Sequence, residues 1–209
     1  MLGHDSSLDA PVVGPDVAGI GADAVDRSLG LPSPYKGLAA YDEADHGLFH
    51  GRGPELAVCR ERLAETGALL LVARSGHGKS SLVRAGLVPT LRAEGRSVVV
   101  LRLGEEPLAS LERALTGRPD DTVLVVDQAE ELFTLVDDAS VREEVASVLL
   151  QQLALGGLVV VLRADHVGSL ALLPDLARAL ERSSYVLGAM TEPGLRAAIE
   201  EPARHQGCR

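Results

Sequence analysis

Short apolar runs that alternate with helix-like segments limit this chain to few folds. The clearest run, "ALLLVA" at 68–73, contains no polar residue, which fits a strand buried on both faces. Other runs rich in valine and leucine lie at 96–103, 121–127 and 157–164, with a shorter one at 184–189. Helical spacing is found at 53–66, 79–92, 107–116, 140–153, 166–182 and 192–206, the last expected to break at Pro202. This alternation predicts an α/β fold with a parallel sheet covered by helices on both faces.

Length and composition allow one substantial domain with an aliphatic core. The chain has 209 residues, of which 46% are apolar and only 2% aromatic, so leucine, valine and alanine must fill the interior. Residues 1–33 are rich in Gly, Pro, Asp and Ser and show no sustained periodicity. We therefore expect a disordered N-terminal tail or linker at 1–33.

Charge and cysteine content argue against several classes of protein. The formal charge is −10, from 30 acidic and 20 basic residues, whereas a nucleic-acid binder needs a basic face. Cys59 and Cys208 lie far apart without a CxxC motif, which predicts neither a zinc site nor a disulfide framework. The N-terminus lacks the cationic start and the long apolar core of a secretory signal. A cytoplasmic protein without a nucleic-acid partner is expected.

One uncharged stretch, 145–162, is long enough to be considered as a membrane span. However, Gln151 and Gln152 lie in its middle, and Gly156 and Gly157 separate a helix-like half from a β-branched half. We interpret the stretch as a helix, a turn and a buried strand, so no membrane partner is expected.

The segment "ARSGHGKSS" at 73–81 follows the first apolar run and opens a predicted helix. Glycine-rich backbone at the start of a helix forms an anion-binding nest, and Lys79 can follow the β- and γ-phosphates of a nucleotide. The alternative is a glycine-rich turn with a surface lysine, and Ala73 stands where such a loop usually has glycine. We predict a P-loop for ATP or ADP whose binding residues are Ser75, Gly76, His77, Gly78, Lys79, Ser80 and Ser81.

A P-loop needs a carboxylate on a neighbouring strand to hold Mg²⁺, and "TVLVVDQAEELF" offers Asp127. We predict Ser80 and Asp127 as the magnesium site, with an ordinary helix N-cap as the alternative for Asp127. Glu130 and Glu131 follow at positions where a helical turn would bring either one near the same site, to orient the attacking water. The alternative for both is a solvated first helical turn.

Arg163 closes the fourth predicted strand in "VVVLRAD". From a strand end it can reach the γ-phosphate and sense its presence. The alternative is a surface arginine paired with Asp165.

Five blocks of the sequence resemble the novel STAND NTPase domain of bacteria, a family of multidomain signal-transduction ATPases related to AAA+ and apoptotic ATPases. The blocks are "SPYKGLAAYDEADHGLFHGRGPEL", "SGHGKSSLVRAGLVPTL", "VLVVDQAEELFTL", "VVVLRADHVGSL" and "LRAAIEEPARHQG". The resemblance runs from about Ser33 to the C-terminus. It implies a three-layer P-loop core at 34–190 with the strand order 5-1-4-3-2, and Gly51 and Arg52 bordering the adenine.

The sequence departs from the family pattern at several positions. Ala73 and Arg74 stand where the family usually has Gly-Pro, His50 replaces an aromatic residue, and Gly53 replaces a glutamate. Family members also continue into a helical lid and further domains, so we expect residues 191–209 to be the start of a truncated lid. The chain would then be a fragment or a shortened gene product.

Two functions follow as hypotheses. The first is a switch ATPase that binds ATP–Mg²⁺ and hydrolyses it slowly, weakly or not at all as an isolated chain. Its further partners, through self-association or protein effectors, would belong to a longer parent chain. The second is a non-hydrolysing nucleotide-binding scaffold or an inactive fragment of a larger regulator. Phosphate release after changes at Glu130 or Glu131 distinguishes the two.

Overall fold

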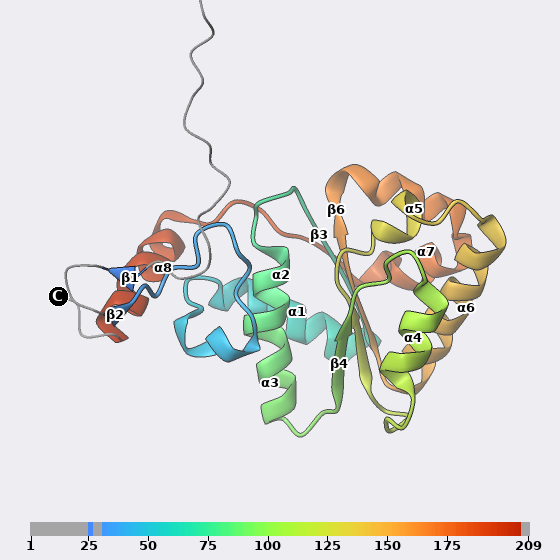
Figure 1. Ribbon diagram of the computed structural model, residues 1–209, viewed down its shortest axis with the longest axis horizontal. Helices are drawn as coiled ribbons and strands as arrows, with labels where there is room; N and C mark the ends of the chain where they lie inside the picture. The colour runs from blue at the N-terminus through green and yellow to red at the C-terminus, as the bar shows by residue number, and fades with distance from the viewer. Residues whose placement is uncertain (1–24, 27–30, 206–209) are drawn as a thin grey trace, which may run out of the picture.

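The structure is a computed structural model that describes residues 25–26 and 31–205. Its centre is a five-stranded parallel sheet in the order β4-β5-β6-β3-β7 (Figure 1). The strands are β3 (Ala68–Ala73), β4 (Val98–Leu101), β5 (Val123–Val126), β6 (Leu158–Arg163) and β7 (Ser184–Val186). Numbered from β3, this is the predicted order 5-1-4-3-2, read from the opposite edge. The predicted α/β fold class is confirmed.

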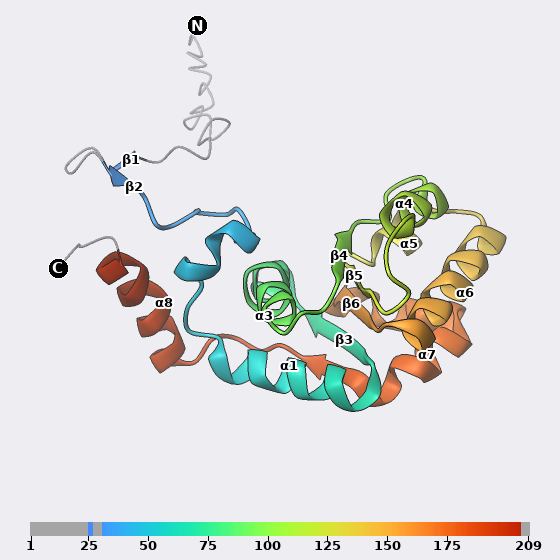
Figure 2. The same ribbon diagram turned by 90° about the horizontal axis from the view of Figure 1, so that it is seen from below.

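Helices cover both faces of the sheet (Figure 2). One face packs against α1 (Gly53–Thr66), η2 (Leu82–Leu87) and α3 (Val88–Ala93). The other packs against α4 (Pro107–Leu115), α5 (Glu131–Thr134), α6 (Ala139–Leu155), η3 (Ala164–Leu172) and α7 (Pro174–Leu180). Cys59 of α1 is buried in the first layer, and burial raises the pKa of its thiol to about 12, so the thiol stays protonated.

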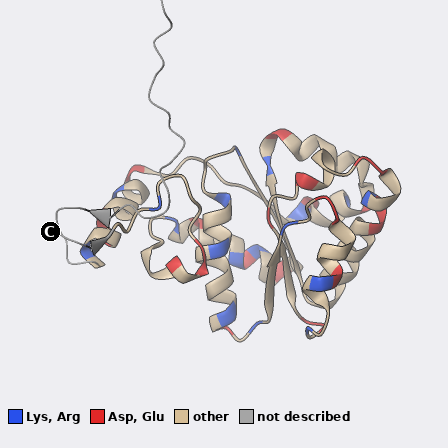
Figure 3. Ribbon diagram, viewed as in Figure 1, with Lys and Arg blue, Asp and Glu red and all other residues tan. Residues whose placement is uncertain are grey.

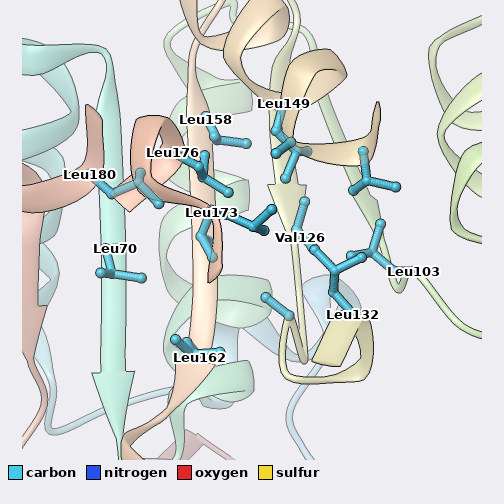
Figure 4. Close-up of a cluster of buried hydrophobic side chains, with 14 of the residues drawn as sticks. Leu70, Leu103, Val126, Leu132, Leu149, Leu158, Leu162, Leu173, Leu176 and Leu180 are labelled. Carbon is cyan, nitrogen blue, oxygen red and sulfur yellow. The ribbon is translucent and has the colours of Figure 1, made fainter. Parts of the chain in front are cut away.

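The apolar runs are continuous because successive strand residues enter different layers. In β3, Leu69 and Leu71 face the layer of α1 and α3, whereas Leu70 and Val72 face the layer of α6 and α7. Figure 4 shows the second layer, where Leu70 of the sheet lies near Leu180 of α7. A polar residue at any of these positions would be buried, so the alternation of side-chain direction demands apolar residues on both sides.

The helix after the glycine-rich loop is less regular than predicted. It starts as α2 (Lys79–Ser81), widens into a π-helical stretch in η2, and returns to α-helical geometry in α3. The segment predicted as one helix at 166–182 is a 3-10 helix, η3, followed by α7 and a short turn, η4 (Glu181–Ser183). The stretch at 145–162 is divided between α6 and β6, as the sequence predicts.

The expected break at Pro202 is wrong, because α8 (Glu192–His205) continues through this residue. Proline removes one main-chain donor, but only three helical residues follow it, so the helix loses little by continuing. Figure 2 shows α8 apart from the sheet, beside the segment that leads into η1 (Glu43–Leu48). The Tyr35 hydroxyl donates to the carbonyl of Ile199 at 2.6 Å, which fixes that segment to α8.

Two short strands lie within the range predicted as a tail. β1 (Val25–Asp26) and β2 (Leu31–Pro32) pair antiparallel. Residues 1–24 and 27–30, to which the prediction of a disordered tail also applies, lie outside the described residues. Within the described part of the chain, no helix is both long enough and apolar enough to cross a membrane.

Candidate nucleotide-binding site

The glycine-rich loop connects the carboxyl end of β3 to α2, at the upper edge of the sheet in Figure 1. Gly76 and Gly78 have φ values of +79° and +82°, a left-handed backbone that favours glycine. A Cβ built on either residue meets no atom within 4 Å, so open space lies beside the loop. Ala73 is the last residue of β3, with extended backbone paired to Arg163, so alanine causes no strain there.

Lys79 lies folded against the loop. Its Nζ donates to the carbonyls of Ala73 at 3.1 Å and Arg74 at 3.2 Å. Partial burial lowers the pKa of the ammonium, and the nearby Glu130 carboxylate opposes that shift. The lysine is therefore a partly buried cation, held within reach of an anion that binds to the loop.

Asp127 follows β5 directly and is fully buried. Its Oδ1 accepts a hydrogen bond from the Ser80 hydroxyl at 3.0 Å, so the two residues predicted to hold magnesium are in contact. The neighbouring helix α5 begins only at Glu131, so Asp127 is not its N-cap residue. The carboxyl ends of β3 and β5 thus bring the loop serine and the aspartate together, although β6 lies between these strands.

Arg84 is a site residue that the sequence analysis missed. Its Nε and one terminal nitrogen lie 3.0 Å and 2.9 Å from Asp127 Oδ2, and its other terminal nitrogen lies 3.1 Å from Asp42 Oδ1. The guanidinium is the counter-charge of the buried aspartate and connects it to the segment before η1. The available signal was the spacing, since Arg84 follows Ser80 by four residues and so lies on the same side of a helix.

Replacing Arg84 with alanine is expected to lower the free energy of unfolding by about 3 kcal/mol, because it leaves a buried carboxylate without its counter-charge. Urea unfolding measures the loss, and Arg92→Ala, which removes a more exposed arginine of α3, is the matched control. In the double variant Arg84→Ala/Asp127→Asn the combined loss should be smaller than the sum of the two single losses. Additive losses would show that the pair does not interact.

The two glutamates of the acidic segment point to different places. Glu130 lines the cavity beside the loop, and its Oε2 accepts a hydrogen bond from the main-chain N–H of Arg163 at 3.3 Å. Glu131 Oε2 instead accepts from the N–H of Gly104 at 3.0 Å, in the loop after β4. Gln128, with a left-handed φ of +57°, turns the chain before α5 begins. Glu130 and Glu131 are adjacent at the start of that helix, so their side chains leave it in different directions.

Arg163 lines the same cavity, but its guanidinium pairs with Asp165 through contacts of 2.6 Å and 3.1 Å. The hydrogen-bonded pairing raises the pKa of Arg163 and lowers that of the Asp165 carboxyl. The surface ion pair that the sequence offered as an alternative is therefore present. Both side chains are well exposed, so water weakens this pair and the arginine can exchange partners.

Two adjacent cavities meet at the loop. The first, of about 490 Å³, has polar and apolar surface in similar shares and is lined by Gly37, Leu38, Ala39, Ala40, Tyr41, Ser75, Gly76, Gly78, Lys79, Ser80, Ser81, Asp127, Gln128, Glu130 and Arg163. The second, of about 420 Å³, is more apolar and is lined by Tyr41, Leu48, Phe49, His50, Arg52, Gly76, His77, Gly78, Ser81, Ala189, Met190, Leu195 and Ala198. Both volumes lie in the range of small-molecule sites.

The segment before η1 covers part of the loop, which the sequence analysis did not foresee. Gly37 to Tyr41 line the first cavity, and the N–H of Tyr41 donates to the Ser81 hydroxyl at 3.1 Å. Ser81 therefore anchors this covering segment to the loop helix.

The residues expected near an adenine have separate roles in the structure. Arg52 is buried, and its guanidinium binds Glu55 at 2.7 Å and the carbonyls of His77 at 3.2 Å and Gly188 at 3.1 Å. It lines the second cavity while joining the loop to the segment after β7. Gly51 is not among the lining residues. Its φ is +86°, and a Cβ there would lie 2.1 Å from the carbonyl oxygen of Gly194, so it allows α8 to approach.

His77 also lines the second cavity. Its Nδ1 is buried and has no hydrogen-bond partner among the residues that the structure describes. A buried nitrogen of this kind is costly unless a ligand or water satisfies it. Together with the open space at Gly76 and Gly78 and the partly buried ammonium of Lys79, it indicates that the residues present fit a ligand with an anionic part and a further polar group.

Three comparisons relate this chain to known proteins. A family model described as Novel STAND NTPase 1 matches residues 34–209. No curated protein matches the chain. A solved structure of the Aeropyrum pernix ORC1 protein in complex with DNA is similar at 18% identity and a TM-score of 0.55, covering 76% of this chain and 50% of that one. A structure of the Aeropyrum pernix ORC2 protein (ADPNP-ADP complexes) gives 16% identity and a TM-score of 0.49, covering 73% and 52%.

The likeness to ORC1 shows the fold alone, because the identity is low. This chain spans about half the length of the solved chains that it resembles.

Proposed function

The chain belongs to the novel STAND NTPase 1 family, and on that premise we propose that it is a signal-transduction ATPase that binds ATP with Mg²⁺ and hydrolyses it slowly. Membership of this family supports nucleoside triphosphate binding at a P-loop. The proposal of Mg²⁺-dependent ATP hydrolysis rests on the contact between Ser80 and Asp127. Both residues line one cavity together with Lys79, Glu130 and Arg163.

We propose that each of the two cavities binds one part of the nucleotide. The phosphates occupy the first cavity, where the main-chain N–H groups of 75–81 and the Lys79 ammonium attract their negative charge. The base and ribose occupy the second cavity, whose apolar side chains, Phe49 and Met190 among them, bury the ring faces. Arg52 borders this cavity and holds the loop in place through the His77 carbonyl.

The hydrolysis step needs a base and charge neutralisation. Glu130 orients a water and accepts its proton while the water oxygen bonds to the γ-phosphorus. The bond from that phosphorus to the β–γ bridging oxygen breaks, which leaves ADP and inorganic phosphate. Ser80 and Asp127 are the residues that would hold Mg²⁺. When bound, this ion neutralises charge on the β- and γ-phosphate oxygens.

Arg163 makes the site bind ATP differently from ADP, because only ATP has a γ-phosphate for it to contact. It leaves Asp165 for the γ-phosphate when ATP is bound, since a phosphate oxygen is a stronger partner than an exposed carboxylate. Arg163→Ala should therefore weaken ATP binding about tenfold and leave ADP binding unchanged, as measured by titration with the two fluorescent nucleotides. Asp165→Asn, which releases the arginine, should bind ATP at least as tightly as the wild type. Equal losses for ATP and ADP in Arg163→Ala would contradict the sensing role.

A second candidate function is a nucleotide-binding scaffold without turnover. The Arg84 contact favours it, because both oxygens of Asp127 accept hydrogen bonds from the protein: Oδ1 from Ser80 and the Gln128 N–H, Oδ2 from Arg84. A carboxylate satisfied in this way binds a further cation less readily. Phosphate release by the wild type and by Glu130 and Glu131 variants decides between the two functions.

The switch itself would act through the segment at 37–41 and α8. This segment lines the phosphate cavity, and Tyr35, two residues before it, donates to the Ile199 carbonyl of α8. A nucleotide that moves the segment would therefore also move α8. α8 begins at Glu192, where the lid was expected to start. We propose self-association or effector binding through α8 as the output of this movement.

The test is binding of fluorescent ATP and ADP to the purified chain, with and without Mg²⁺. Saturable binding in which ATP depends on Mg²⁺ more strongly than ADP is the expected result. If a folded chain, checked by thermal unfolding, binds neither nucleotide, the P-loop is not a working site in this chain.

A further inference from the structure

Strand β4 leaves one side of its main chain without a neighbouring strand. It lies at the edge of the sheet, with β5 on its other side (Figures 1 and 2). The carbonyl of Ser97 accepts from the N–H of Val123 in β5 at 2.8 Å, and that of Leu101 accepts from the N–H of Asp127, directly after β5, at 2.9 Å. Because donors and acceptors of a parallel strand alternate in direction, the main-chain groups of Val98 and Val100 point away from β5. An exposed edge of this kind is a template for a further strand.

A groove of about 390 Å³ runs along this edge. It is lined by Asp42, Glu43, Arg84, Val88, Arg92, Val98, Val99, Val100, Leu101, Arg102 and Arg118. Its four arginines come from four places in the chain: Arg84 from η2, Arg92 from α3, Arg102 from the residue after β4, and Arg118 from the loop before β5. Figure 3 shows basic residues recurring along the helix that runs through α2 and α3, beside β4.

Two of these arginines have no acidic partner. Arg84 pairs with Asp42 and Asp127, and Arg92 pairs with Glu43. Arg102 and Arg118 make no ion pair with any residue of the described part of the chain, and both are exposed. In a chain whose net charge is −10, this groove is a local surplus of positive charge beside an open strand edge.

We propose that the β4 edge groove binds an extended acidic segment of a partner protein, which adds to the sheet as a sixth strand. The main chain of the segment pairs with the outward N–H and C=O of Val100 and with the outward N–H of Val98, because the Val98 carbonyl already accepts from Arg92 at 3.1 Å. Its carboxylates meet Arg102 and Arg118. Alternate side chains of an extended segment lie on the same face, so a glutamate at every second position matches the arginines.

The edge favours a peptide over a nucleic acid. A peptide strand supplies N–H and C=O groups in the spacing that β4 presents, whereas a phosphodiester backbone has no such donors. Two arginines suit a short acidic segment better than a phosphate backbone that needs many basic contacts.

The test measures fluorescence anisotropy of a labelled peptide of about eight residues that alternates Glu with Thr and Val. The full chain should bind it saturably, and Arg102→Ala/Arg118→Ala should weaken binding about fivefold or more. The matched control is Arg113→Ala/Arg178→Ala, which removes two exposed arginines outside the groove and should bind like the wild type. Val100→Pro should also weaken binding, since proline removes an N–H that points outward and not one bonded to β5.

A second peptide keeps the proposal falsifiable if Val100→Pro does not fold. The same sequence methylated on alternate main-chain nitrogens keeps its charge but cannot pair as a strand, and it should bind at least about fivefold more weakly. Equal binding of both peptides, or no effect of the Arg102 and Arg118 changes, would overturn the proposal. It would also fail if oligothymidylate displaced the peptide at lower concentration than unlabelled peptide does. Dimerisation through this edge, abolished by Val100→Pro in sedimentation, would make a second copy the occupant and overturn it as well.

Discussion

Lys79→Ala is expected to bind ATP about 100-fold more weakly than the wild type, because two charge-assisted hydrogen bonds to phosphate are lost. The ammonium already lies at the loop, 3.1 Å and 3.2 Å from the carbonyls of Ala73 and Arg74, with a pKa lowered by burial. Little movement is then needed to reach a phosphate. Alanine provides neither charge nor donor, and no other lysine or arginine of the loop helix lines the phosphate cavity in the described part of the chain.

Titration of fluorescent ATP measures the loss, and the chain supplies a chemically matched control. Lys36 is its only other lysine. It pairs with Asp45, and neither residue is among those that line the cavity, although Lys36 directly precedes the lining residue Gly37. Lys36→Ala should bind ATP within about threefold of the wild type, since it removes a partly exposed ion pair. Both variants should unfold near the wild-type temperature. Tight ATP binding by Lys79→Ala would show that the loop is a structural turn with a lysine in it.

The parts of this site that depend on local pattern were predictable from the sequence. The run at 68–73 is the strand β3 with the same bounds, because a segment apolar at every position has few other places to be buried. The contact between Ser80 and Asp127 was predictable for a similar reason. Carboxyl ends of parallel strands meet at one edge, and the order of the strands brings the loop and the aspartate close.

The parts that depend on tertiary contacts were not predictable. Arg84 has the local sequence of an ordinary helical residue, and only the fold places Asp127 and Asp42 against it. The course of α8 through Pro202 likewise depends on packing, since local preference favours a break. The cover formed by residues 37–41 comes from a segment whose composition indicates only a loop.

The backbone conformation of the acidic segment at 127–131 differs from the one expected from the sequence. A helical turn starting at Asp127 would bring either Glu130 or Glu131 near the predicted magnesium site. Gln128 instead adopts a left-handed conformation, which a non-glycine residue rarely does, and α5 starts three residues later. Glu130 consequently lines the phosphate cavity, and Glu131 holds the N–H of Gly104.

Because Glu130 and Glu131 lie in different places, we expect the same substitution at each to change the rate of phosphate release differently. Glu130→Gln should lower the rate of phosphate release at saturating ATP by about 100-fold or more, because the amide cannot accept a proton from water. Glu131→Gln should retain the wild-type rate within about threefold, since an amide oxygen still accepts from Gly104 and the residue lies outside the cavity. Both variants should bind ATP like the wild type, as neither residue is expected to contact the phosphates in the ground state.

Glu131→Gln is the matched control for Glu130→Gln, because the two substitutions are chemically identical and lie at adjacent positions. A large loss in Glu131→Gln with none in Glu130→Gln would contradict the assignment of the base. Turnover that is unaffected by both changes would show that neither carboxylate takes part in the chemistry. If the wild type binds ATP but releases no phosphate, Glu130 has no water to activate, and the chain is the scaffold that the Arg84 contact with Asp127 favours. Release that depends on Glu130 alone would make it a switch that resets itself.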